Sequence, residues 1–154
     1  MLNGCRELAG RHGLDAPVYE TRVRRFGECT WLEGKPMNAQ DLGLKVVHIG
    51  VNEADKEGAG ATAQLFARLL GLQTMETPVS TMVGTVIEVM NSTARGTHGH
   101  IAIHADDIPA AEQYFAQHGF TIDESSRRTM PDGSTHLVYF NEEVAGFAIH
   151  LTRD

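Results

Sequence analysis

The chain has 154 residues, of which 42% are hydrophobic and 21% charged, a composition typical of one globular domain with a substantial core. No apolar run approaches the roughly 20 residues that span a bilayer, and we expect no secretory leader. Residues 1–40 carry six basic and five acidic side chains, and residues 41–154 carry seven and fifteen. This acidic body argues against nucleic-acid binding. Cys5 and Cys29 have no metal-type or disulfide spacing, so we expect a cytoplasmic protein.

Residues 1–40 are predicted to form an N-terminal extension that packs against the main body. A short helix is expected within residues 1–16, and residues 18–32 favour a strand or hairpin that Gly27 interrupts. Three arginines of this segment could contact an anion, although a solvated strand edge explains them more simply. These are Arg22, Arg24 and Arg25.

The main domain is predicted over residues 41–154, and its first unit spans about residues 44–91. Residues 44–51 favour a strand, and Asn52 can cap a helix that is regular from about Ala61 and ends at Gly71. The helix carries an apolar stripe, formed by Leu65, Phe66, Leu69 and Leu70. Three strands are expected to follow, over residues 74–78, 80–83 and 85–90.

The second unit spans about residues 98–153 and repeats this order. A strand begins near Gly99, and a helix follows Asp107 with Pro109 in its first turn. Tyr114 and Phe115 are expected to face the core, and Gly119 to cap the end of the helix. Strands are then predicted over residues 120–123, 137–140 and 147–152, with a loop over 125–134 around the turn at 131–133. The fold class is therefore α+β, built from two strand-helix-strand-strand-strand (βαβββ) units.

Both units place a potential metal ligand at the same two positions. His48 and His100 lie on the first strand of each unit, and Glu88 and His150 lie on the last. Side chains alternate along a strand, so each curved sheet can present its pair on one face, and two paired units would bring all four into one cleft. Imidazole and carboxylate suit Zn, Ni, Co, Mn or Fe. We therefore predict a divalent metal site at His48, Glu88, His100 and His150.

Other polar residues are weaker candidates for function. His98 and His104 share a face with His100 and could support the ligands, although solvent-facing positions explain them equally well. Tyr139 could donate a hydrogen bond in the cleft or belong to the core. Three arginines in predicted loops could clamp an anionic substrate, although each could also be an ordinary surface residue. These are Arg95, Arg127 and Arg128. His118 is interpreted as a helix-end contact and His12 as a surface residue.

The duplicated unit resembles the vicinal oxygen chelate superfamily, which includes glyoxalase I, extradiol dioxygenases, methylmalonyl-CoA epimerase and bleomycin-resistance proteins. The resemblance covers about residues 44–154 and is strongest at residues 87–90, 99–103 and 146–151. These stretches are most similar to the module that is associated with keto-hydroxyglutarate/keto-deoxy-phosphogluconate aldolases. The family's ligand positions fall on the same four residues, and His150 stands where glyoxalase I usually has a glutamate.

The resemblance implies a metal-dependent enzyme acting on a small keto or hydroxy acid whose neighbouring oxygens chelate the metal. Lyase, isomerase and epimerase chemistry all remain open. Glu88 would be a ligand that could detach to move a proton, and is therefore the catalytic candidate. The alternative is a non-enzymatic small-molecule-binding or aldolase-accessory module that has kept the fold and lost the metal. The family commonly pairs modules across chains, so a homodimer is expected.

Overall fold

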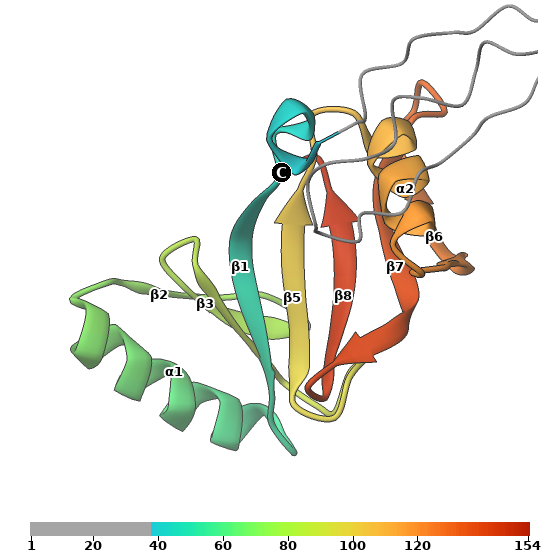
Figure 1. Ribbon diagram of the computed structural model, residues 1–154. Coiled ribbons are helices and arrows are strands. Elements are labelled where there is room, and N and C mark those ends of the chain that lie inside the picture. The colour runs from blue at the N-terminus through green and yellow to red at the C-terminus, as the bar shows by residue number, and fades with distance from the viewer. Residues whose placement is uncertain (1–37) are drawn as a thin grey trace, which may run out of the picture. The chain divides into compact units, whose positions relative to one another are not determined.

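The computed structural model describes residues 38–154, which fold around one eight-stranded mixed sheet (Figure 1). A 3-10 helix, η1 (Ala39–Leu42), precedes β1 (Lys45–Asn52), α1 (Lys56–Leu70), β2 (Thr74–Glu76), β3 (Ser80–Val83) and β4 (Ile87–Met90). The second unit consists of β5 (Gly99–His104), α2 (Ile108–Gln117), β6 (Ile122–Thr129), β7 (Thr135–Val144) and β8 (Phe147–Thr152). The helix, strands and three arginines predicted within residues 1–37 lie outside the described residues.

The strand order is β2-β3-β4-β1-β5-β8-β7-β6. β1 and β5 pair antiparallel at the centre, and each pairs in parallel with the last strand of its own unit. The outer strands of each unit pair antiparallel. The order therefore reads the same from either edge once the two units are exchanged, and the predicted α+β fold of two βαβββ units is confirmed.

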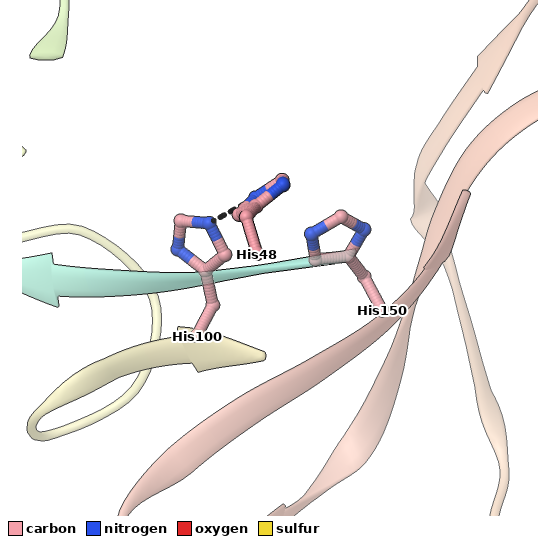
Figure 2. Close-up of side chains that lie close together, drawn as sticks. All are labelled: His48, His100 and His150. Carbon is pink, nitrogen blue, oxygen red and sulfur yellow. Dashed lines mark hydrogen bonds between the residues drawn. The ribbon is translucent and has the colours of Figure 1, made fainter. Parts of the chain in front are cut away.

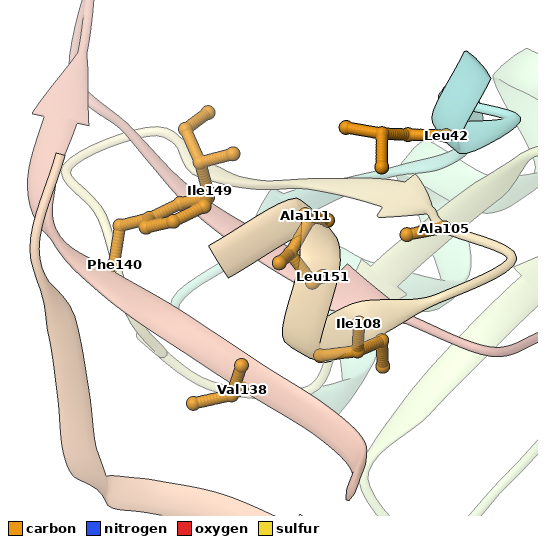
Figure 3. Packing of buried hydrophobic residues seen from close by; sticks show 8 residues of the cluster. All are labelled: Leu42, Ala105, Ile108, Ala111, Val138, Phe140, Ile149 and Leu151. Atoms are coloured by element: carbon orange, nitrogen blue, oxygen red, sulfur yellow. The ribbon is translucent and has the colours of Figure 1, made fainter. Parts of the chain in front are cut away.

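Alternation along the strands separates a core face from a polar face. On β8, Ile149 and Leu151 join the cluster beneath α2, whereas His150 points to the opposite face of the sheet. On β4, Val89 packs with Ala59 and Ala63 of α1, whereas Glu88 faces away from them. Figure 3 shows the larger cluster, in which Ile108 and Ala111 of α2 pack with residues of β7 and β8. Both helices thus cover one face of the sheet and leave the other free for a site.

Helix α1 differs from its prediction at both its start and its buried face. The cap is Asp55, whose side chain accepts a hydrogen bond from the N–H of Gly58, so the helix begins at Lys56. Asn52 instead bonds across to the β4–β5 connection, with its Nδ2 2.8 Å from the carbonyl of Gly96. The helix ends at Gly71, with φ +69, as predicted.

The apolar stripe predicted on α1 is largely exposed. Leu65 and Leu69 are 60% and 76% exposed, and Phe66 packs against the core. The buried positions are Ala59 and Ala63, four residues apart. Small side chains let the helix approach β3 and β4 closely, and this rotates the larger leucines outward.

The second unit has longer outer strands than predicted. β6 and β7 extend through most of the predicted loop and leave a turn only at residues 130–134. Arg127 and Arg128 consequently lie in a strand, whereas Arg95 lies in the β4–β5 connection as expected. The residue that caps α2 is His118, and Gly119 follows it with φ +87. None of the helices within residues 38–154 is long and apolar enough to cross a membrane.

Candidate metal centre

Three imidazoles converge on the polar face of the sheet, one from each of β1, β5 and β8 (Figure 2). One ring nitrogen of each of His48, His100 and His150 lies within 4.8 Å of the others. His100 and His150 are buried, with 4% and 1% of their surface exposed, and His48 is half-buried. The duplicated histidines and the histidine of the last strand therefore meet in one place.

Glu88 approaches the same point from β4. Its Oε2 lies 3.5 Å from Nε2 of His48 and 3.2 Å from Nε2 of His100, and these two nitrogens are 3.1 Å apart. Glu88 therefore contacts two of the three histidines, and all four side chains that the sequence singled out line the same cleft.

Two small residues make this convergence possible. Glu88 and His100 both stand opposite Gly50, which lies on the strand between them. Backbones two strands apart are about 10 Å from each other, so the two outer side chains meet only by leaning over the middle strand. A Cβ on Gly50 would overlap the imidazole of His100. The absence of a side chain at Gly50 therefore leaves the room that the imidazole of His100 occupies.

The second unit repeats the device with Ala102. This residue is fully buried and stands opposite both His48 and His150. Gly50 and Ala102 each come two positions after the histidine of their own strand. This small residue at the second position is a sequence signal that the motif analysis missed.

Burial and mutual contact set the charges of these groups. Burial, followed by the neighbouring His100 and His48, lowers the pKa of His150 to about 3. Burial and His100 likewise lower the pKa of His48. The pKa of Glu88 falls to about 2, mainly because His100 hydrogen-bonds to its carboxylate and also because Ser80 does. At neutral pH, His48 and His150 are therefore neutral and Glu88 is charged.

Ser80 is a further residue that the sequence patterns did not indicate. Its buried Oγ donates to Oε1 of Glu88 at 2.7 Å and lies 2.8 Å from Oγ1 of Thr77. Oε1 is thereby occupied, and Oε2 is left facing the imidazoles. The contact depends on the register of β3 against β4, which no sequence pattern indicates.

We expect Ser80→Ala to raise the pKa of Glu88 in the metal-free protein, because the carboxylate loses a donor that favours its ionised form. The cost in unfolding free energy should be about 1.5–3 kcal/mol, the usual range for hydrogen bonds to charged groups. Carbon-13 NMR titration of the glutamate carboxyls and urea denaturation measure the two effects. Glu76, paired with Lys56 at 2.8 Å, serves as the internal control. An unchanged Glu88 titration would contradict the role of Ser80.

Of the weaker candidates, Tyr139 lines the cleft and Arg95 contacts its ring. Tyr139 lies in the cleft, with its ring 4.7 Å from that of His150, and its hydroxyl has no hydrogen-bond partner among residues 38–154. The guanidinium of Arg95 lies 4.8 Å from the centre of the Tyr139 ring and pairs with Asp123 at 2.7 Å. Burial raises the pKa of Tyr139, so its phenol stays protonated at neutral pH.

The other candidate arginines and histidines form contacts outside the cleft. Arg127 forms ion pairs with Glu112 and Glu124, both at 2.7 Å. His104 bonds to Asp106, and His98 is an exposed residue beside Phe147. Arg128 contacts the backbone carbonyls of its neighbours. None of these side chains is among the residues that line the cleft.

No protein-family model matches the chain, and neither does any curated protein. Solved structures with a similar arrangement include methylmalonyl-CoA epimerase from Mycobacterium tuberculosis, at 12% identity and a TM-score of 0.48 over 70% of this chain and 85% of the other. A Streptomyces coelicolor methylmalonyl-CoA epimerase variant in complex with 2-nitronate-propionyl-CoA is 17% identical, with a TM-score of 0.49 over 70% and 92%. A hypothetical protein from Bacillus halodurans is 16% identical, with a TM-score of 0.48 over 71% and 93%.

These similarities concern the arrangement of strands and helices alone. The chain's own topology is more informative, because two βαβββ units join through their first strands into a single sheet. Residues 38–154 therefore have the α+β fold of the vicinal oxygen chelate, or glyoxalase-like, proteins.

Proposed function

We propose that the chain is a vicinal oxygen chelate enzyme that holds a divalent metal ion at His48, Glu88, His100 and His150. The observation that carries this proposal is the set of three contacts among His48, His100 and Glu88. A neutral or charged imidazole has at most one hydrogen on Nε2, and the ionised carboxylate of Glu88 can only accept. No placement of protons turns all three contacts into hydrogen bonds, because at least one pair always opposes two lone pairs or two hydrogens.

A cation between these atoms would remove the conflict, since all three groups could then direct lone pairs at it. The distances fit this arrangement. Ligands about 2.0–2.2 Å from a metal lie about 2.8–3.1 Å apart at right angles and about 3.3–3.6 Å apart at tetrahedral angles, and the 3.1, 3.2 and 3.5 Å found here lie within this overall span. The low pKa values of His150 and Glu88 also favour binding, because neither group must release a proton at neutral pH.

The orientation of His150 supports the same assignment. Its Nδ1 lies 3.4 Å from the carbonyl oxygen of Leu151, to which an Nδ1–H can donate weakly. This tautomer leaves the Nε2 lone pair free for a metal. His150 is the most deeply buried of the three histidines, so it is the ligand best shielded from solvent.

The proposed reaction is a proton transfer beside the carbonyl of a keto or hydroxy acid, of the epimerase, isomerase or lyase type. The metal would supply a Lewis acid for neighbouring substrate oxygens. Glu88 is the candidate to carry the proton through Oε2, while Ser80 holds Oε1. The low pKa of Glu88 makes it a weak base until its contact with His100 is released. The hydroxyl of Tyr139, which lines the cleft, can donate to a substrate oxygen.

A second candidate function is a non-enzymatic binding protein or an accessory module for an aldolase. The cleft on its own supports it, because a volume of about 730 Å³ can enclose a small molecule without any reaction. Both candidates are proposed as cytoplasmic homodimers.

Metal analysis separates the two candidates. We expect purified protein to hold one divalent ion per chain, and His100→Ala to lose it. His98→Ala should retain it, because His98 is an exposed neighbour outside the cluster. Plasma mass spectrometry and a competition titration with a chromophoric chelator measure content and affinity. Failure of the wild-type protein to bind Zn, Ni, Co, Mn or Fe(II) would overturn the enzyme proposal.

A further inference from the structure

Three methionines line one wall of the cleft beside the imidazoles. Met75 on β2 pairs with Met82 on β3, and Met82 pairs with Glu88 on β4. Met90 lies two residues beyond Glu88 and therefore on the same face. All three border the cleft that also contains His48, His100 and His150.

The methionine wall, formed by Met75, Met82 and Met90, spans β2, β3 and β4 and extends away from the histidines. Strands in a sheet are about 4.8 Å apart, so β2 lies about 10 Å from β4 and its Glu88. Met82 and Met90 are half-buried, and Met75, at the rim, is 63% exposed. Thioether side chains are flexible and polarisable, and such groups adapt to apolar ligands.

The opposite wall has a different character. The position of unit two that corresponds to Met82 is Tyr139, which pairs with His150 as Met82 pairs with Glu88. Unit one thus lines the cleft with three methionines beside the polar residues Lys45, His48, Thr85 and Glu88, whereas unit two has Tyr139 at the position of Met82. Its volume of about 730 Å³ lies in the range of sites for drug-sized ligands. A three-carbon acid would leave most of the methionine wall exposed to water.

We propose that the ligand of this cleft is amphiphilic: its oxygen-bearing end lies at the three imidazoles, and an alkyl or aryl group lies along Met75, Met82 and Met90. This inference rests on the proposed function for the placement of the oxygen-bearing end. It narrows the substrate class from small keto or hydroxy acids to those with an extended apolar substituent.

The test is a series of 2-keto acids of increasing chain length, from pyruvate through 2-ketohexanoate to 2-ketooctanoate. Each is titrated calorimetrically into the zinc-loaded protein. Each methylene that is buried should tighten binding about four-fold, giving at least about 100-fold across the series. Met82→Ser should flatten the dependence on chain length, and Met82→Leu should keep it. Met130→Ser is the matched control, because Met130 is an exposed methionine outside the cleft.

The outcomes distinguish the ligand class from the metal. Equal affinity for all chain lengths, an identical series in Met82→Ser and Met130→Ser, or no binding of 2-ketooctanoate at millimolar concentration overturns the inference. Repeating the series with metal-free protein and with His100→Ala tests the two parts separately. A chain-length dependence that persists without metal supports the methionine wall, and an overall affinity that is unchanged by removal of the metal counts against the metal proposal. Bound zinc together with an affinity that does not depend on chain length supports the metal proposal and contradicts the methionine wall.

Discussion

Gly50→Ala should abolish high-affinity metal binding while leaving the fold in place. The added Cβ would come closer than 3.0 Å to the ring atoms of His100, which lies across the glycine towards Glu88. The backbone itself accepts alanine, because φ at Gly50 is outside the left-handed range. The ring must therefore move, and the 3.1 and 3.2 Å contacts of its Nε2 are lost. We expect at least a 100-fold loss of zinc affinity, comparable to the upper range for displaced supporting groups.

The same substitution should lower the unfolding free energy by about 1–3 kcal/mol, the usual cost of overpacking a buried site. Gly60→Ala provides the matched control. It lies inside α1, and nothing lies within 4 Å of the Cβ that alanine would add. It should raise stability by about 0.5–1 kcal/mol and leave zinc affinity unchanged. Chelator competition and urea denaturation measure both variants. Equal zinc affinity in Gly50→Ala and wild type would refute the proposed packing of His100.

Acid should destabilise the metal-free protein through His150. An unfolded chain protonates this histidine below pH 6.5, whereas the folded protein resists protonation until about pH 3. The unfolded state therefore binds more protons in this window, and stability falls as pH decreases from 6.5 towards 3. At pH 4, the contribution of His150 is on the order of 3 kcal/mol.

The variant His150→Leu should lack this contribution, because leucine fills a similar volume without titrating. Urea denaturation between pH 7 and pH 4 compares the two proteins after metal removal. The wild-type curve should fall more steeply, and the difference should grow below pH 6.5. Glu88 titrates in the folded state near pH 2, and its contribution is lost as pH falls from 4.5. It is present in both proteins and cancels in the comparison. Parallel curves would contradict the buried, neutral state of His150.

Local pattern was sufficient to predict the repeated unit and the four candidate ligands. Period-two alternation places Glu88 on the face opposite Val89, and His150 opposite Leu151, whatever the neighbouring strands are. Helix ends were less predictable. Asn52 and Asp55 are both residue types that commonly cap helices. Asp55 caps α1, because the side chain of Asn52 instead bonds to the β4–β5 connection.

The features that decide the chemistry of the site are non-local. The register between β3 and β4 places Ser80 within hydrogen-bonding distance of Glu88, and the same register places Met82 of the methionine wall opposite Glu88. Gly50 matters because His100, fifty residues later in the chain, stands opposite it on the adjoining strand. The sequence by itself determined which side chains could form a metal centre, because alternation and repetition are properties of each segment alone. Only the tertiary structure decided how closely they approach, because strand register and the space above a small residue arise when distant segments pack together.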